Sequence, residues 1–451
     1  MNLPAYVFRC LSLLESAGFP TYAVGGCVRD YLLGKEPHDF DLCTAALPEE
    51  IQAVFSGFRL SLAGIKHGTV GVVTPGGLVE ITTFRTEGGY QDGRHPEWVS
   101  FVSSIEEDLA RRDFTINAMA YSPIRGLRDP FGGQVDLQSK LLRAVGDPER
   151  RFSEDALRIL RGVRFAAVYQ LSVDAETEKA MLARRGQMDD LARERVFEEL
   201  CKLLPQARAS LLIQFAPILA QAVPELAPTL GFLQHNPHHA YDVFTHTAHV
   251  VEAVPPALPL RWAALLHDIG KPAVFTMDAL GCGHFKGHAQ VSAELADQAL
   301  RSLKASAALR EAVVKLIGLH MLELEPDKKL LRRRVSKYGL ETIEALLALQ
   351  RADFGGKGTG TNTLHPEFDQ TAALLREIRE EDACLTVSGL AVTGRDLIAL
   401  GYVPGKALGR CLDDLLTQVL EERLPNERQA LLAAAEDALK KISYKQQEES
   451  L

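Results

Sequence analysis

The segment that most constrains this chain is YAVGGCVRDYLLGKEPHDFDL, at residues 22–42. Its β-branched and aromatic start predicts a strand that stops at Gly25 and Gly26. Two glycines remove side chains where a backbone can approach phosphate closely, and VRDYLL then predicts the start of a helix. Asp39 and Asp41 stand two positions apart, so on a strand both carboxylates face one side. This order predicts a site for a nucleoside triphosphate and a divalent metal.

A third carboxylate follows on the next predicted strand. The run LVEITTF is β-branched, and it places Glu80 where it can join Asp39 and Asp41. Three carboxylates can hold two Mg²⁺ ions, one lowering the pKa of an attacking hydroxyl and the other clamping a triphosphate and its leaving group. Each piece alone is most often a solvated turn, loop or strand position. Together they predict that Asp39, Asp41 and Glu80 are catalytic.

Two further motifs place arginines beside acids. In EEDLARRDFTINA, adjacent arginines including Arg112 suit triphosphate oxygens, and Asp113 can accept hydrogen bonds from ribose hydroxyls. In FSEDALRILRGVRFAAVY, charged residues recur every three positions, at 155, 158, 161 and 164, and this spacing predicts one stripe along a helix. Asp155 and Arg158 at its start pair an acceptor with a donor fork, which suits the Watson–Crick edge of a base. A surface salt bridge is the alternative. The remaining stripe residues are Arg161 and Arg164.

The composition changes along the chain. Its 451 residues exceed one compact core, and short β-like runs before residue 140 give way to helical spacing after it. We therefore expect an α/β head at 1–140, a helical block at 141–225, a histidine-rich block at 235–355 and a final helical block at 366–443.

The net charge of −9 excludes coating of nucleic acid through bulk charge, but local basic clusters occur at 140–164 and 327–337. We expect no membrane contact, because no apolar run is long enough to span a bilayer. The seven cysteines form no C-x-x-C pair, which fits a reducing cytoplasm.

Nine of the thirteen histidines lie between positions 235 and 320. In RWAALLHDIGKP, His267 and Asp268 end an apolar helix, and His246 lies on an earlier predicted helix. Imidazole and carboxylate are suitable ligands for Mn, Fe, Ni, Zn or Mg. A His-Asp pair with histidines on both sides and a later aspartate predicts a second metal site, whose other candidate ligands are His288, His320 and Asp353.

The motifs GGCVRD, DFDL, EDLARRDFTINA, EDALR and RERVFEELCKLL, in this order, resemble those of the class II tRNA nucleotidyltransferases. These are the bacterial CCA-adding enzymes of the polymerase-β superfamily, with poly(A) polymerase relatives. The resemblance implies a polymerase-β-like α/β head at 1–140 followed by a mostly all-α body. That body would hold a helical nucleotide-selecting and RNA-binding domain at 141–225, the histidine-rich domain at 235–355 and a C-terminal helical tRNA-binding domain at 366–443. It implies template-independent addition of CCA to tRNA 3′ ends from CTP and ATP, with Mg²⁺ in the head, release of pyrophosphate and no DNA partner.

The resemblance also implies residue roles. Gly26 and Arg29 match the family's phosphate-binding positions, and Asp39 and Asp41 match its Mg²⁺ ligands. The other matched nucleotide contacts are Arg112, the amino-acid template Asp155 and Arg158, and the arginines Arg161 and Arg164. The loop with Asp92 and Arg94 resembles the flexible loop that adds the terminal A.

The order H…HD…H…H…D resembles an HD phosphohydrolase domain. It implies His246, His267, Asp268 and Asp353 as core ligands of a divalent metal of unknown identity, with His288 and His320 completing a two-metal site. Such domains hydrolyse phosphomonoesters or phosphodiesters with metal-bound water. A degenerate domain kept as a helical scaffold is the alternative.

Three other readings of the whole chain stay open. One is a poly(A) polymerase of the same superfamily, which would add many A residues and ignore CTP. Another is an HD phosphohydrolase whose head only binds RNA. The third is a specialist that adds only CC or only A.

Overall fold

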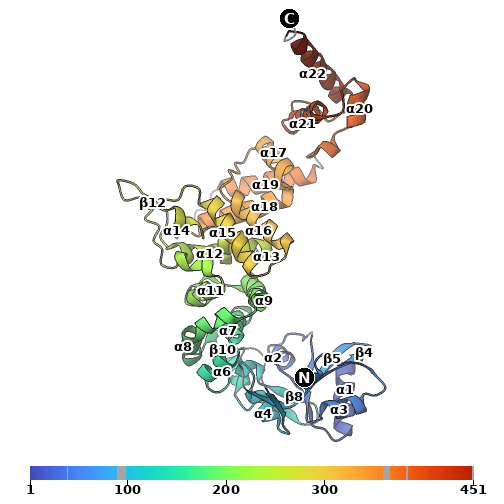
Figure 1. Cartoon of the computed structure of the whole chain (residues 1–451), viewed down its shortest axis with the longest axis vertical. Coiled ribbons are helices and arrows are strands. Elements are labelled where there is room, and N and C mark those ends of the chain that lie inside the picture. Colours follow the sequence, from blue (N-terminus) through green and yellow to red (C-terminus); the bar gives the residue numbers. More distant parts are fainter. Residues whose placement is uncertain (38, 89–97, 359–365, 382–383, 449–451) are drawn as a thin grey trace. The chain divides into compact units, whose positions relative to one another are not determined.

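The computed structural model describes residues 1–37, 39–88, 98–358, 366–381 and 384–448 (Figure 1). The chain divides into two compact units, Met1–Leu230 with Asp297–Arg310 and Gly231–Ala296 with Glu311–Leu451. The four domains predicted from the sequence are a finer division and stay a prediction.

The head of the first unit contains a mixed sheet. Within the described residues its seven strands run in the order β3-β4-β5-β2-β1-β8-β9. The predicted strands TYAV and LVEITTF are confirmed as β1 and β5. Central β2 pairs antiparallel with β1 and parallel with β5. The bounds are β1 (Thr21–Val24), β2 (Asp41–Thr44), β3 (Arg59–Ser61), β4 (Thr69–Thr74), β5 (Gly77–Thr83), β8 (Ala120–Ser122) and β9 (Gly126–Arg128).

Apolar side chains fix helices on this sheet. α1 (Ala5–Ser16) and α3 (Pro48–Val54) contact each other and β5, and they lie beside β4 and β5 in Figure 1. Leu11 and Leu14 of α1 are fully buried against this layer. A separate cluster packs α4 (Ile105–Ala110) through Leu109, together with Tyr22, Val24, Cys43 and Phe84. Burial of these side chains supplies most of the stabilisation and holds the ends of β1 and β2 in place.

Helices complete the first unit after residue 140. α7 packs most extensively on α9, and α6 packs on α8. The buried residues of α7 include Ile159, Leu160 and Val163. The helices are α2 (Gly26–Leu32), α5 (Gly133–Gln138), α6 (Pro148–Glu154), α7 (Leu157–Tyr169), α8 (Ala175–Arg184), α9 (Arg193–Leu203), α10 (Ala209–Gln214) and α11 (Ala216–Ala222).

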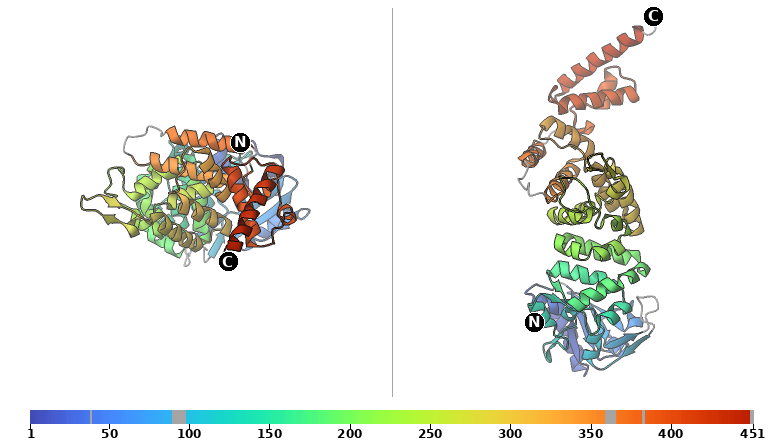
Figure 2. Two further views of the ribbon diagram at one scale, coloured as in Figure 1. Left: turned by 90° about the horizontal axis from the view of Figure 1, so that it is seen from above. Right: turned by 90° about the vertical axis from the view of Figure 1, so that its left-hand side faces the viewer.

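Helices also dominate the second unit, with one short hairpin of β12 (Thr276–Met277) and β13 (Gly283–His284). α12 packs on α13 and α18, and α20, α21 and α22 share a separate apolar core at the C-terminal end (Figure 2). The helices are α12 (Val243–Ala253), α13 (Leu258–Leu266), α14 (Lys271–Val274), α15 (His288–Ser302), α16 (Ala307–Leu319), α17 (Lys328–Tyr338), α18 (Leu340–Gly355), α19 (Pro366–Glu380), α20 (Gly394–Ala399), α21 (Lys406–Leu420) and α22 (Arg428–Glu448).

The basic cluster on α17 is paired within the protein. Lys328 forms ion pairs with two glutamates of the α19 segment, and Arg332 bridges from Glu381 to Glu422. Arg333 pairs with Glu421 just after α21. These contacts link three helices.

In the described part of the chain, no helix is both long and apolar enough to cross a bilayer.

Candidate active site

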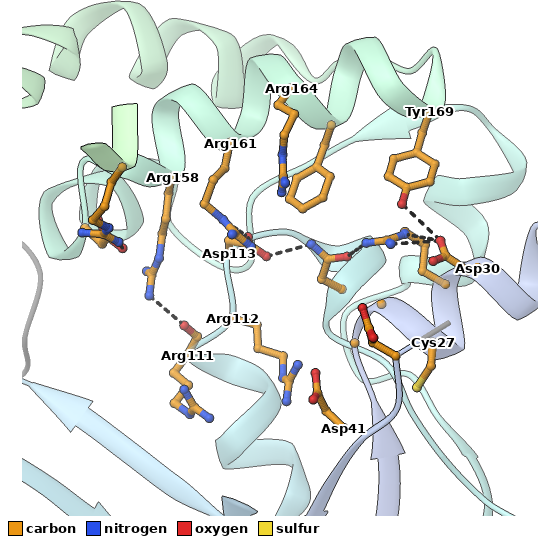
Figure 3. A pocket seen from close by; sticks show the side chains of 18 residues that line it. Cys27, Asp30, Asp41, Arg111, Arg112, Asp113, Arg158, Arg161, Arg164 and Tyr169 are labelled. Atoms are coloured by element: carbon orange, nitrogen blue, oxygen red, sulfur yellow. Dashed lines mark hydrogen bonds and ion pairs between the residues drawn. The ribbon is translucent and has the colours of Figure 1, made fainter. Parts of the chain in front are cut away.

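A polar cavity of about 750 Å³ opens in the first unit. It brings together the β1–α2 turn, the start of β2, the segment after α4 and one side of α7. Figure 3 shows arginines of α7 pointing toward Arg112 and Asp41. The lining residues include all but one of the predicted head-site residues: Gly25, Gly26, Arg29, Asp39, Asp41, Arg112, Asp113, Asp155, Arg158, Arg161 and Arg164.

The exception is Glu80, which does not line the cavity but lies beside Asp41. The parallel pairing of β2 and β5 places the two residues directly opposite each other. Partial loss of hydration, followed by the negative charges of Glu80 and Asp39, raises the pKa of Asp41. Within the described residues, no lysine or arginine forms an ion pair with any of the three acids. The nearby Arg112 guanidinium offsets part of the rise in the pKa of Asp41, and the remaining excess of negative charge fits a divalent cation.

Asp39 does not lie on the strand as predicted. β2 begins only at Asp41, so Asp39 belongs to the loop that leads into it. The same-face argument for a strand is therefore wrong for this pair. Both side chains still line the cavity, because the loop enters the strand from the cavity side.

Gly25 shapes the turn between β1 and α2. It caps α2 with a φ of 71°, a conformation that favours glycine. A Cβ at Gly25 would lie only 2.8 Å from Nη1 of Arg112, so a side chain there would displace this guanidinium. Arg112 is also held from behind, since its Nη2 lies 3.3 Å from Oδ2 of buried Asp108. The sequence therefore needs a glycine for both backbone and space.

Asp113 is the centre of a hydrogen-bond network. Its Oδ2 accepts bonds of 2.9 and 2.7 Å from Arg161, and its Oδ1 accepts bonds from Asn117 Nδ2 and the Phe114 amide. Burial raises the pKa of Asp113, but Arg161 and these bonds outweigh it and hold the pKa well below its usual range. Both oxygens are saturated, which leaves no acceptor for the predicted ribose contact. The geometry assigns Asp113 to the placement of Arg161.

The predicted helical stripe is interrupted at its first member. Asp155 has an extended backbone between α6 and α7, and α7 begins at Leu157, so Asp155 does not share a helix with Arg158. Asp155 accepts hydrogen bonds from the Leu157 amide and from Arg195 Nη2. Arg158 donates to Glu154 and to the carbonyl of Arg111. Both side chains still line the cavity, now held by separate partners.

The other two arginines of the stripe lie on α7 as predicted. Arg164 forms a 2.9 Å ion pair with buried Glu199 of α9, and its guanidinium lies 4.3 Å from the ring centre of Phe165. Arg161 approaches the same Glu199 at 4.0 Å. α7 thus presents a row of fixed cations to the cavity.

Several lining residues were not predicted as site residues. Arg195 lies within the quoted motif RERVFEELCKLL and Asn117 within DFTINA, so both carried a local signal. Asp30 ends the quoted motif GGCVRD and Tyr169 ends FSEDALRILRGVRFAAVY, but the contact between them depends on how α7 meets α2. The predicted loop with Asp92 and Arg94 lies outside the described residues.

A second cluster of chemical groups is buried in the second unit. His246 Nε2 lies 2.9 Å from Asp353 Oδ1 and 3.5 Å from Asp268 Oδ2, and His267 Nε2 lies 3.2 Å from the same Asp268 oxygen. The other oxygen of Asp268 lies 3.4 Å from His288 Nε2. His320 completes a second group with Asp268 and His288. All six predicted ligands therefore converge.

Backbone carbonyls fix the orientation of the four imidazoles. Each Nδ1 lies within hydrogen-bond distance of a carbonyl, and the partners in chain order are Gly356, Ala264, Phe285 and Ile317. Because Nδ1–H donates to the carbonyl, each neutral ring turns an Nε2 lone pair inward. His288 Nε2 and His320 Nε2 then face each other at 3.0 Å, which is repulsive unless a cation lies between or beside them. Burial lowers the pKa of His320 to about 4, which disfavours a proton as that cation. The donor set fits a transition-metal ion.

Comparisons with known proteins agree with this architecture. Residues 21–143 match the model of the poly A polymerase head domain, residues 170–230 that of a probable RNA and SrmB binding site of polymerase A, and residues 285–435 that of tRNA nucleotidyltransferase domain 2. The CCA-adding enzyme of Streptococcus mutans is 34% identical over 438 residues, which are 96% of this chain and 97% of that protein. That of Levilactobacillus brevis is 35% identical over 95% of this chain and 96% of its own length.

Solved structures give the same result. The Bacillus stearothermophilus CCA-adding enzyme in complex with CTP aligns with a TM-score of 0.71 and 28% identity, covering 99% of this chain and 100% of that one. The Thermotoga maritima CCA-adding enzyme complexed with tRNA shares the fold, with a TM-score of 0.60, 21% identity and coverage of 96% and 95%. The full-length matches above 30% identity show that this chain belongs to the CCA-adding enzymes, a family of tRNA nucleotidyltransferases.

Proposed function

We propose that the template-independent addition of CCA to tRNA 3′ ends, the reaction of this family, takes place in the cavity between β2 and α7. The observation that carries this proposal is that Asp39, Asp41 and a row of fixed arginines line one cavity, with Glu80 directly beside Asp41. A triphosphate needs cations on its oxygens, and a nucleotidyl transfer needs carboxylates that hold metal near the α-phosphate.

Different side chains of the cavity bind the triphosphate and the metal. Arg29 and Arg112 hold the triphosphate of CTP or ATP over the Gly25–Gly26 turn. Asp39 and Asp41, with Glu80 behind them, would hold Mg²⁺, which activates the attacking tRNA hydroxyl and neutralises the leaving pyrophosphate.

The base is selected by protein groups. Arg158 and Asp155 meet its Watson–Crick edge, and the separate partners of these two residues keep the donor fork and the acceptor in place before nucleotide arrives. Arg161 and Arg164 add positive charge along the same face of α7. We place the reaction in the cytoplasm, since tRNA is its substrate.

Incorporation on a tRNA transcript that lacks its CCA tests this proposal. We expect two C residues to be added with CTP alone and one further A when ATP is also present, read as product length on a gel. A ladder of A residues with ATP alone would move the chain to the poly(A) polymerases. Arrest after CC with both nucleotides, or addition of A only to a transcript that ends in CC, would identify a specialist.

A second prediction concerns the phosphate-binding turn. Gly25→Ala would strain a positive φ and displace Arg112, so we expect kcat/KM for CTP to fall about tenfold or more. Steady-state kinetics at saturating tRNA measures the effect. Gly57→Ala is the matched control, because a Cβ there meets nothing within 4 Å and the φ is not positive. Equal kinetics for both variants would contradict the proposed role of the turn.

We also propose that the buried histidine cluster is a metal-dependent phosphohydrolase centre. The specific observation is the set of four imidazoles locked by carbonyls with their Nε2 atoms around Asp268 and Asp353. A divalent transition metal held there would supply a bound water that attacks phosphorus. Burial lowers the pKa of His288 and His320 and so favours their neutral imidazoles, and the neighbouring histidines lower the pKa of Asp268 and Asp353 and so favour ionised carboxylates, which are the forms that bind metal. A phosphorylated or 2′,3′-cyclic RNA end is the substrate class that would serve tRNA repair.

A further inference from the structure

We infer that Tyr169, at the end of α7, is a positioning residue for nucleotide binding, because it holds Arg29 in place for the triphosphate. This inference rests on the proposed function of the cavity. It assigns a role to a residue that would touch neither the base nor the proposed metal-binding carboxylates of Asp39, Asp41 and Glu80.

Tyr169 contacts Arg29 in two ways, one direct and one through Asp30. The centre of its ring lies 4.3 Å from Cζ of Arg29, so the guanidinium is held against an aromatic face. Its hydroxyl donates a 3.1 Å hydrogen bond to Oδ1 of Asp30. The same oxygen accepts a 2.9 Å bond from Nε of Arg29. Figure 3 shows Tyr169 pointing from α7 toward Asp30.

Arg29 is enclosed on its other sides as well. Its Nη1 donates to Oδ1 of Asn117, and a Cβ at Gly26 would meet its Nη2 at 3.5 Å. The residue is only 7% exposed. An arginine side chain loses much rotamer freedom when it is fixed, and here the protein bears that cost before a ligand arrives. The remaining guanidinium N–H groups can then bind phosphate oxygens without reorganisation.

A second chain of contacts reaches Arg29 from the same helix. Arg161 binds Asp113, Asp113 accepts a hydrogen bond from Asn117, and Asn117 accepts one from Arg29. α7 therefore holds Arg29 at two points, eight positions apart along the helix. Because α7 also carries Arg158, the geometry couples the triphosphate site to the helix that selects the base.

A purely structural Tyr169 would behave differently. Removal of a packing aromatic lowers stability and leaves the KM of the folded enzyme unchanged. A positioning role predicts a change in nucleotide affinity that passes through Arg29. Since CTP and ATP share the triphosphate, it also predicts an equal effect on both nucleotides.

Kinetics of three single variants and the wild type separates these cases. With a tRNA lacking CCA, we expect Tyr169→Ala to raise KM for CTP about tenfold while kcat changes less than about threefold. With a tRNA ending in CC, the rise in KM for ATP should be the same. Tyr169→Phe keeps the ring against Arg29, so its KM should rise only about twofold to threefold. Tyr31→Ala is the control, because Tyr31 is an exposed tyrosine next to Asp30 on α2.

A double variant provides the decisive comparison. In an Arg29→Ala background, Tyr169→Ala should cause no further rise in KM, since its partner is already absent. Additive effects, or a lower melting temperature with an unchanged KM, would overturn the inference. Failure of the proposed function is a distinct result, because the wild-type enzyme would then incorporate neither C nor A. An Arg29→Ala variant with the activity and the KM of the wild type would also overturn the inference.

Discussion

Asp41→Ala should abolish nucleotide incorporation, with a loss of at least about a thousandfold in rate, because it removes a carboxylate that holds metal at the reacting phosphate. The stability of the folded state should not decrease. Loss of hydration and the negative charges of Glu80 and Asp39 raise the pKa of Asp41. At pH values above this pKa, the ionised carboxylate therefore lowers the stability of the folded state. Removing this charge at neutral pH relieves repulsion, so we expect a melting temperature in metal-free buffer no lower than that of the wild type.

Matched measurements make this result specific. Glu49→Ala removes an exposed acid from α3 and should leave incorporation unchanged. Phosphoester hydrolysis by the histidine cluster should persist in Asp41→Ala, because its ligands all lie in the second unit. Incorporation that survives in Asp41→Ala would contradict the assignment of the carboxylates and leave the head as an RNA-binding module.

His267→Ala should have the opposite effect on the two activities, with hydrolysis lost and CCA addition kept. It removes a fully buried ligand that faces both Asp268 and Asp353, so we expect loss of bound transition metal and at least about a hundredfold loss of hydrolysis of a chromogenic phosphodiester. Metal content by elemental mass spectrometry and hydrolysis rate are the measurements. Chelation should lower the melting temperature of the wild type by about 5 °C and that of the variant by much less.

The control for this prediction is His284→Ala, which removes an exposed histidine from the β12–β13 hairpin. CCA addition should continue in both variants. A wild-type protein that binds metal but hydrolyses no phosphomonoester, phosphodiester or cyclic phosphate would show a structural metal. A protein that binds none would support the degenerate scaffold.

Local sequence was sufficient for the elements that carry the head site. Strand composition, the glycine pair and the spacing of acids predicted β1, α2 and β5 and identified Asp41 and Glu80 as neighbours. The direct pairing of Asp41 with Glu80 depends on the register of two parallel strands that are far apart in the chain. Nothing in either segment encodes that register, so it required the structure.

The misplaced residues have a common physical cause. EDALRILRG is rich in good helix formers, but Asp155 has an extended backbone, in which its carboxylate accepts hydrogen bonds from the Leu157 amide and from Arg195. Asp113 looked available for ribose because the sequence does not show that Arg161 and Asn117 saturate it. For the histidine cluster, residue types and order predicted the ligands, whereas the carbonyls that orient each ring follow only from the packing of the helices.

The ion pairs of α17 have a consequence for the thermodynamics of RNA association. A lysine or arginine strengthens binding to a polyanion partly because the nucleic acid releases condensed small cations when that side chain replaces them. Lys328, Arg332 and Arg333 already have glutamates as counterions, and each would have to give up a carboxylate before it could serve a phosphate. These three side chains, although they belong to a strongly basic stretch of the sequence, would thus contribute little to the ionic-strength dependence of tRNA affinity.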